Sequence, residues 1–328
     1  MSGILNLDFW IFVAVIAGTY TIFALGIQLE FGVAGLFNFG QVAFMAVAAY
    51  TMAILIVRLD VPMPLAATAA ILAAVALGVL LGVPTLRLRA DYLAMATIAA
   101  GEIVRYLAVN LQGVTGGPVG TVHLLGPGQL ASYNDEWLGF QESLRQLLVP
   151  LVGEAAATRD LAMLVVVWPV ALALVAIIAV MVRSPWGRAL RAVREDEEAA
   201  AALGKNVYAL KMQALLIGSA LGGVAGIFLA WQLSVFSPAD FRPTFTFFAY
   251  IIVILGGMTR PWAVPVGALI FGLLFAGTRF LDFFPLDLIG SGERAFLRLL
   301  IVGLALVLLM VFRPQGIFGK RKELVLEQ

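Results

Sequence analysis

The sequence predicts an all-α membrane protein, because it is too apolar for a soluble domain and because its apolar residues form runs long enough to cross a bilayer. Of the 328 residues, 62% are hydrophobic and 12% are charged, and the mean hydropathy is +1.00. Soluble domains are about half apolar and about a quarter charged. The runs are continuous rather than alternating, which favours helices over a β-barrel.

Nine candidate spans follow from the rule that a bilayer core of about 30 Å needs about 20 apolar residues. In chain order they are residues 8–29, 33–57, 65–83, 91–109, 161–182, 212–233, 243–257, 262–281 and 295–312. The total ranges from eight to ten, because the span 243–257 is short and the stretch 26–41 mixes four glycines with polar side chains. Such a composition at membrane depth is typical of a broken helix that is buried in protein or lines a cavity. Residues 1–328 are predicted to form a single transmembrane domain.

The basic residues predict which side of the membrane each loop occupies. Thirteen Lys and Arg residues fall on one side of the nine spans and five on the other, with Arg105, Arg279 and Arg298 inside spans left out. The rich side holds the C-terminal tail and the loop 183–211, and we expect it to be cytoplasmic with the N-terminus outside. No basic residue precedes the first apolar run, which indicates a retained span rather than a cleaved signal peptide.

A weak internal repeat accompanies these spans. Residues 32–37 read GVAGLF and residues 223–228 read GVAGIF. A second match pairs Ala49, Tyr50, Ile54 and Leu55 with Ala249, Tyr250, Ile254 and Leu255. Under the predicted topology the segments after the two tyrosines run in opposite directions, as in an inverted-topology repeat with a substrate path between its halves. Chance similarity between Gly/Ala-rich membrane segments explains the matches equally well.

Several function classes are excluded by composition. The chain has no Cys and one His, so thiol chemistry, Cys-bound zinc and a multi-His metal site are not expected, and no metal or cofactor is predicted. The net charge of +1 gives no general reason to bind nucleic acid. The Gly-rich stretch 113–120 lacks the Lys-Ser/Thr ending of a phosphate-binding loop. No residue constellation predicts an enzyme.

Two polar loops are long enough to carry a function. The loop 110–160 on the expected outer side is either a gate or docking surface, or a turn followed by an amphipathic interfacial helix over 138–152. The loop 183–211 predicts a helix from Gly187, with possible ion pairs between Arg191 and Glu195 and between Arg194 and Glu198, capped by Gly204. Such a helix is suited to a groove in a second protein, or it is a solvated linker.

Motifs along nearly the whole chain resemble the permease subunits of branched-chain amino acid ABC importers, M-type, a family that also includes urea and short-chain amide permeases. These motifs are residues 35–50 (GLFNFGQVAFMAVAAY), 88–105 (LRADYLAMATIAAGEIVR), 115–120 (TGGPVG), 187–230, 255–258 (LGGM) and 314–319 (PQGIFG). The resemblance implies a prokaryotic inner-membrane subunit that imports branched-chain amino acids or similar small polar solutes. It also implies a second permease subunit, two cytoplasmic ATPases that hydrolyse the ATP, and a periplasmic binding protein as partners.

The same resemblance identifies an ATPase-coupling loop. The family's EAA-like loop matches Glu197, Glu198, Ala199 and Gly204, although the stretch EEAAAALG is shorter than the general importer consensus. The coupling residues expected here are Arg188, Arg191, Arg194, Glu197, Glu198, Ala199 and Gly204.

The translocation path is predicted from polar residues inside spans, where isolated charge is costly. The candidates are Asn38 and Gln41, together with Glu102 and Arg105. The alternative for Asn38 and Gln41 is a structural role as hydrogen bonds between helices. The alternative for Glu102 and Arg105 is an ion pair that holds helices together. Two other function classes are weighed against the ABC permease. A self-sufficient proton-coupled transporter would use Glu102, and a membrane scaffold would leave the Gly-rich polar spans unexplained.

Overall fold

The computed structural model describes residues 7–124, 135–154, 156–233 and 235–277, together with residues 300, 303, 304, 307, 317 and 318. Every regular element in these ranges is helical and none is a strand, so the all-α prediction is confirmed for this part of the chain. Six of its helices are long and apolar enough to cross a membrane.

The six long helices coincide with six of the predicted spans. They are α1 (Leu7–Ile27, continued by a π-helix over Gln28–Val33), α2 (Gln41–Leu59), α3 (Met63–Thr85), α4 (Ala90–Asn110), α8 (Arg159–Arg183) and α11 (Val207–Leu233). The predicted span 33–57 begins too early, because residues 34–40 form no regular helix between the π-helix and α2. A helix break within 26–41 is what its glycines and polar side chains predicted.

Two of the nine predicted spans form a bent helix pair instead. Residues 243–257 and 262–281 were expected to be two spans, but α12 (Thr244–Gly256) and α13 (Val264–Gly277) have 13 and 14 residues and are bent by 107° at their junction. A helix of that length extends about 20 Å, which is less than the bilayer core. The pair is therefore one broken span or a re-entrant segment, giving six or seven spans among the described residues. The predicted span 295–312, Arg279 and Arg298 lie outside the described residues.

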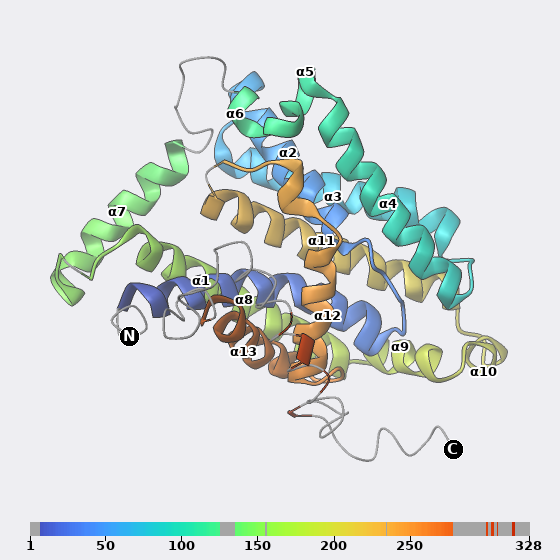
Figure 1. The fold of residues 1–328 in the computed structure, drawn as a ribbon. Helices are drawn as coiled ribbons and strands as arrows, with labels where there is room; N and C mark the ends of the chain where they lie inside the picture. The colour runs from blue at the N-terminus through green and yellow to red at the C-terminus, as the bar shows by residue number, and fades with distance from the viewer. Residues whose placement is uncertain are drawn as a thin grey trace.

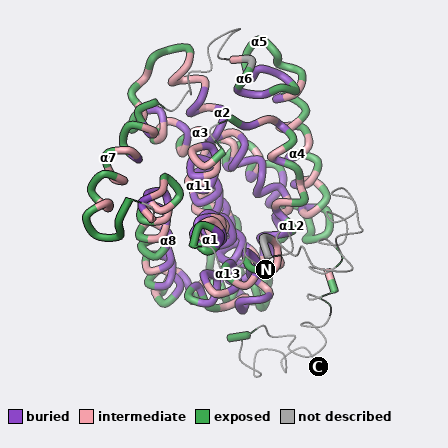
Figure 2. Tube along the Cα trace, turned by 60° about the vertical axis from the view of Figure 1, so that its left-hand side comes forward, coloured by how far each residue is buried: buried purple, intermediate pink, exposed green. Residues whose placement is uncertain are grey.

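The middle of the bundle is formed by α1, α2 and α11, and the other long helices surround them (Figure 1). Buried residues make up 72% of the apolar stretch of the first span and 67% of that of α11, but only 28% of those of α3 and α4. Figure 2 shows the same gradient, with the buried trace gathered around α1 and α11. The break after α1 and the buried polar residues around it lie among the central helices, which keeps them away from lipid.

A stripe of small residues allows α3 to lie against α11. Its buried positions recur every four residues and are Ala66, Ala70, Ala74, Gly78 and Gly82. This spacing places them on one face of the helix, and small residues allow close approach of membrane helices. The opposite face of α3 exposes large apolar side chains such as Leu72 and Leu80, as a lipid or a second membrane subunit requires.

The loop 110–160 contains short helices followed by a long amphipathic one. They are α5 (Gln112–Thr115), a 3-10 turn over Gly117–Val119, α6 (Thr121–Leu124) and α7 (Asp135–Val152). A helix forms where one was predicted over 138–152: α7 buries Trp137 and Gln141 and leaves the apolar side chains of Phe140, Leu147 and Leu151 exposed. Trp137 stacks on Trp231 of α11 with ring centroids 4.2 Å apart. The hydrogen-bonded Arg145 lowers the pKa of Glu142 on the exposed face, and the side chain of His123 is not among those described.

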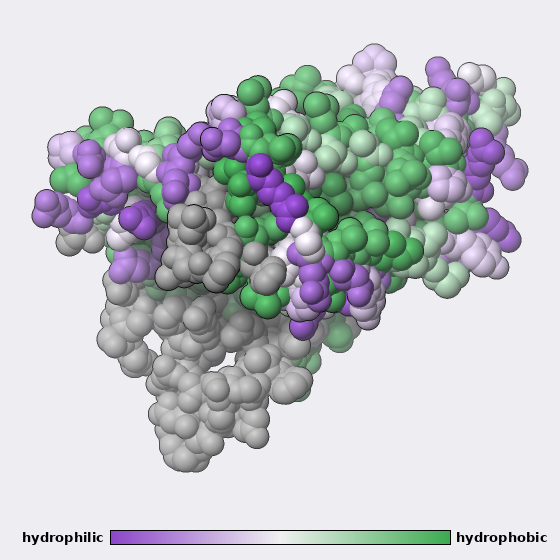
Figure 3. Space-filling view, turned by 90° about the horizontal axis from the view of Figure 1, so that it is seen from above, coloured by the Kyte–Doolittle hydropathy of each residue, from purple (hydrophilic) through white to green (hydrophobic). Residues whose placement is uncertain are grey.

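Hydrophilic side chains gather at two opposite ends of the molecule and apolar ones cover much of the surface between them (Figure 3). One end carries α7, and the other carries α9 (Pro185–Glu195) and α10 (Glu197–Ala202). This is the surface that a bilayer-spanning protein presents, with a polar region on each side of an apolar belt.

Candidate functional site

The first span ends in a break that lies inside the protein. After α1 the chain widens into the π-helix, in which Gln28, Glu30 and Gly32 are buried. The amide of Ala34 then donates to the carbonyl of Leu29, 3.1 Å away, and the helix stops. π-Helical turns are rare and occur frequently at functional sites. Residues 34–40 make no helical ladder, but the amides of Leu36, Asn38 and Gly40 donate to acceptors close by in the sequence.

Four buried polar side chains surround this break, and we call Gln28, Glu30, Asn38 and Gln41 the polar cluster. Asn38 Nδ2 donates to Glu30 Oε2 at 2.8 Å and to Gln41 Oε1 at 3.2 Å. Gln41 Nε2 donates to the carbonyl of Gly218 at 2.8 Å, and Gln28 Nε2 donates to the carbonyl of Met258 at 3.1 Å. The cluster therefore joins α1, α2, α11 and the α12–α13 junction.

Two acceptors of the polar cluster have no hydrogen-bond partner among the described residues. They are Gln28 Oε1 and Glu30 Oε1, both fully buried. Glu30 Oε1 lies against Gly218, where a Cβ would overlap the carboxyl group. A buried acceptor without a donor costs about 1–3 kcal/mol. The cluster is thus closed and tightly packed, yet it retains unused hydrogen-bonding capacity at membrane depth.

The non-helical segment 34–40 is tied to two further helices. The amide of Phe39 donates to Thr97 Oγ1 of α4 at 3.0 Å. Tyr250 Oη of α12 donates to the carbonyl of Asn38 at 3.0 Å. Thr246 Oγ1, one turn earlier on α12, accepts from the amide of Val42 at 3.1 Å. The start of α2 is therefore held by α4 and α12 as well as by the polar cluster.

The two tyrosines of the sequence repeat make reciprocal contacts. Tyr50 of α2 packs on Phe236 and Phe241, in the segment that precedes α12, with centroids 5.1 and 5.8 Å away. Tyr250 of α12 packs on Phe31 and Phe39, in the segment that precedes α2, with centroids 5.3 and 4.7 Å away. The GVAG match has no such counterpart, because residues 32–37 end a helix whereas 223–228 lie inside α11.

The loop 183–211 contains two helices where one was expected. Ser184 caps α9 by accepting from the amide of Gly187, and Pro185 occupies the first turn. The helix ends at Asp196, whose Oδ1 accepts from the amide of Ala199 and caps α10. Gly204 follows α10 with φ +74, which agrees with the predicted helix-ending role.

The expected ion pairs Arg191–Glu195 and Arg194–Glu198 are not formed among the described residues. Instead, the three arginines of α9 donate to main-chain carbonyls. Arg188 Nη1 contacts the carbonyl of Arg183 at 3.2 Å, and Arg191 Nη2 contacts that of Val182 at 3.1 Å. Both partners lie at the end of α8. The Arg194–Glu198 pair fails because Asp196 breaks the helical register that i,i+4 pairing needs. Arg191 and Glu195 both lie in α9, and the Arg191 guanidinium group donates to the end of α8 instead.

Arg194 connects the loop to the break in the first span. Its Nη1 donates to the carbonyl of Gly32 at 2.6 Å, across 162 residues of sequence. Its aliphatic part packs on Gly35, which has φ +72. Gly32 belongs to the same π-helix as Glu30, so the loop and the polar cluster share one structural element.

The tip of the loop is exposed to solvent, and an ion pair attaches it to the start of α11. Glu197 pairs with Lys211 at the start of α11. Glu198 and Ala199 are exposed, and Leu203 is 80% exposed. In Figure 1, α10 projects beyond the rest of the bundle. An exposed leucine beside acidic residues on a projecting helix is a surface suited to a partner protein.

The second pair of path candidates lies elsewhere, on the outer helix α4. Arg105 and Glu102 form a bidentate ion pair with a shortest distance of 2.7 Å, and their side chains are 19% and 30% exposed. Among the described residues no hydrogen bond joins this pair to the polar cluster. The structure thus brings Asn38 and Gln41 together, brings Glu102 and Arg105 together, and keeps the two pairs apart.

The polar residues missed as candidates are Glu30, Gln28, Tyr250 and Thr246. The unusual composition of the stretch 26–41 contained the signal for the first two. The last two lie in a hydrophobic stretch, TFTFFAYIIVILG, where a single Thr or Tyr is unremarkable. Their role follows only from the contact between α12 and the start of α2.

Six long apolar helices around a broken, internally hydrogen-bonded span are typical of a polytopic membrane protein. A family model described as the permease component of branched-chain amino acid transport systems matches residues 9–311. The chain belongs to this family. It is accordingly the membrane permease component of an ABC transport system, and not its catalytic subunit.

Similar proteins support the same assignment. The high-affinity branched-chain amino acid transport system permease protein LivM of Escherichia coli is 33% identical over 93% of this chain and 69% of its own length. The probable branched-chain amino acid transport permease LivM of Methanocaldococcus jannaschii is 23% identical over 93% of this chain and 91% of its own. BraD of Pseudomonas aeruginosa is 32% identical over 42% of this chain. No solved structure matches significantly. The chain is thus a multi-pass membrane protein homologous to bacterial inner-membrane permeases.

Proposed function

We propose that the chain forms one half of an import path for branched-chain amino acids or similar small polar solutes, in the inner membrane of a prokaryote. Its partners are a second permease subunit, two cytoplasmic ATPases and a periplasmic binding protein. The six basic residues of the loop 183–211 support placing the coupling loop in the cytoplasm. If the α12–α13 pair is a re-entrant segment, the predicted span 295–312 returns the C-terminus to the same side. The chain provides the path and the contact surface for the ATPases, and the energy comes from ATP hydrolysed by them.

The observation that carries the mechanism is the hydrogen bond from Arg194 to the carbonyl of Gly32. A movement of α9 imposed by an ATPase reaches the π-helix through this contact. Because Glu30 lies in the π-helix and binds Asn38, the movement also reaches the polar cluster.

The polar cluster is the proposed closed gate of the path. Asn38 and Gln41 are 2% and 0% exposed and hydrogen-bond to each other, so no opening passes between them in this conformation. When the cluster separates, its amides and the unused acceptors of Gln28 and Glu30 become available to a zwitterionic solute. The pair Glu102–Arg105 neutralises itself on α4 and remains a second candidate for lining the path.

Reconstitution in liposomes tests the function. We expect uptake of a branched-chain amino acid only when the second permease, the ATPases and the binding protein are all present. ATP must be supplied on the side of the liposome membrane that carries the ATPases. A protonophore and the substitution Glu102→Gln should leave the uptake rate unchanged. Uptake by this chain alone, collapsed by the protonophore and by Glu102→Gln, would instead establish the proton-coupled transporter.

The exposed tip of the coupling loop should control ATPase binding. Glu198→Arg reverses a charge that has no ion-pair partner among the described residues, so the fold should be kept while ATPase co-purification is lost. Glu197 is unsuitable for this test, because its replacement also removes the pair with Lys211. The matched control is Glu154→Arg, an exposed glutamate in the loop 110–160. Unchanged co-purification with Glu198→Arg would remove the tip from the interface.

A further inference from the structure

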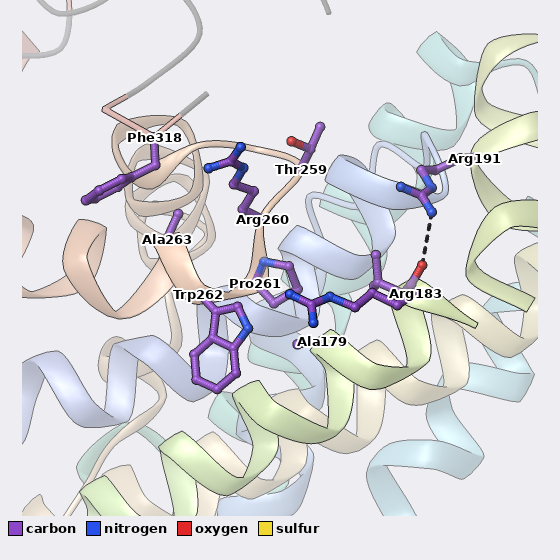
Figure 4. A pocket seen from close by; sticks show the side chains of 10 residues that line it. Ala179, Arg183, Arg191, Thr259, Arg260, Pro261, Trp262, Ala263 and Phe318 are labelled. Carbon is purple, nitrogen blue, oxygen red and sulfur yellow. Dashed lines mark hydrogen bonds between the residues drawn. The ribbon is translucent and has the colours of Figure 1, made fainter. Parts of the chain in front are cut away.

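One cavity lies beside the coupling loop rather than at the polar cluster. It has a volume of about 530 Å³ and lies between the end of α8, the helix α9 and the junction of α12 and α13. Its lining includes three arginines, Arg183, Arg191 and Arg260, from these three elements. Figure 4 shows Arg183 extending toward Trp262 and Pro261, Arg260 between Thr259 and Phe318, and Arg191 at the α9 side.

The charge of this cavity is not neutralised by the described part of the chain. None of the ion pairs formed there involves Arg183, Arg191 or Arg260. Arg191 donates one hydrogen bond, to the carbonyl of Val182, and keeps its other N–H groups. All three arginines are exposed to solvent. Three guanidinium groups around one cavity attract an anion, and phosphate is the anion whose geometry they match best.

The rest of the lining is apolar and reaches into the membrane-spanning part of α8. Ala179 and Val182 belong to the last turns of that span, and Pro261 and Ala263 are buried at the start of the 3-10 turn before α13. Trp262 is 50% exposed at the same place. Indole rings favour the membrane interface, where one side is apolar and the other is wet. The cavity is therefore amphipathic, with basic groups beside an apolar wall.

We propose that this cavity binds the headgroup of an anionic phospholipid. Its phosphate lies among Arg183, Arg191 and Arg260, and its glycerol and upper acyl part lie against Val182 and Trp262. A basic pocket between helices on the cytoplasmic side is the expected site for such a headgroup, since anionic lipids are concentrated in that leaflet. An acidic side chain of a soluble subunit would use the arginines but would have no need of the apolar wall.

Such a lipid would link the coupling loop to the bend between α12 and α13. Arg191 belongs to α9, whereas Arg260 belongs to the junction whose Met258 carbonyl accepts from Gln28 of the polar cluster. The bound phosphate would hold these two elements together. The inference does not depend on which solute the path carries.

Native mass spectrometry of the full chain in detergent tests the site with dioctanoyl phosphatidylglycerol as the probe. Dioctanoyl phosphatidylcholine and inorganic phosphate are run in parallel. We expect saturable binding of the phosphatidylglycerol, weakened about tenfold or more by the double substitution Arg183→Gln and Arg260→Gln. Arg89→Gln, an exposed arginine at the start of α4 outside the cavity lining, should leave the affinity unchanged.

Three results would overturn the proposal. Equal affinity in the double variant and the parent chain would show that lipid binds elsewhere. Binding of inorganic phosphate as tight as that of phosphatidylglycerol would indicate a site for a free anion. Loss of ATPase co-purification in the double variant, with lipid binding unchanged, would assign the arginines to the ATPase interface. A thermal unfolding midpoint equal to that of the parent chain shows that the double variant is folded.

Discussion

Arg194→Ala is expected to lower ATP-driven uptake about tenfold or more while the ATPases still co-purify with the chain. A hydrogen bond from a charged donor contributes about 1.5–3 kcal/mol, which corresponds to roughly a factor of ten or more in an equilibrium. In the variant the carbonyl of Gly32 loses its partner and α9 is no longer attached to the π-helix. Uptake and ATP hydrolysis should be measured on the same proteoliposomes, because uncoupling lowers the first and spares the second.

Arg188→Ala is the matched control for this prediction. Arg188 also lies on α9 and also donates to a carbonyl, but its partner Arg183 is at the end of α8. The control should reduce uptake much less than Arg194→Ala, and Arg194→Lys should restore part of the activity because a lysine can still donate to a carbonyl. Equal losses in the two alanine variants would mean that α9 acts as a whole and that the contact with Gly32 has no special role.

Asn38→Leu should produce the largest loss of stability of any single substitution in the polar cluster. Leucine has a similar volume but removes the two donations to Glu30 and Gln41 and leaves the Glu30 carboxyl group without a donor. Stranding a buried polar group costs about 1–3 kcal/mol, and more when the group is charged. Thermal unfolding in detergent should therefore show a markedly lower midpoint, together with lost uptake.

The comparison variant is Asn110→Leu. Asn110 is exposed at the end of α4 and its side chain donates only to the carbonyl of Tyr106 one turn earlier. Water can replace that bond, so the unfolding midpoint should barely change. If Asn38→Leu were no less stable than Asn110→Leu, the polar cluster would not hold the start of α2 in place.

Local features of the sequence are enough to predict most of the helices. Length and hydropathy identify all six long helices, since an uninterrupted apolar run of about 20 residues has few alternatives to a span. The break near residues 34–40 is also visible, because glycines and amides are unusual at membrane depth. The amphipathic pattern over 138–152 identifies most of α7 in the same way.

Contacts between distant residues could not be predicted from these patterns. Residues 243–257 and 262–281 are two apolar runs separated by a short polar junction, and this pattern fits two spans as well as a pair bent by 107°. The hydrogen bond between Arg194 and Gly32 and that between Gln41 and Gly218 join residues 162 and 177 positions apart. Glu30 is a different case, because it lies only eight residues from its partner Asn38 and the composition of the stretch 26–41 contained its signal.

The long sequence separation between the start of α2 and the residues that hold it has a consequence for biosynthesis. The partners that stabilise the start of α2, Gly218, Thr246 and Tyr250, follow their contacts by 177, 204 and 212 residues. At about 5–20 residues per second a ribosome needs roughly 10 to 40 s to supply them. During that interval the Glu30–Asn38 turn is in or near the bilayer without its partners, so the nascent chain depends on the insertion machinery to shield it from lipid.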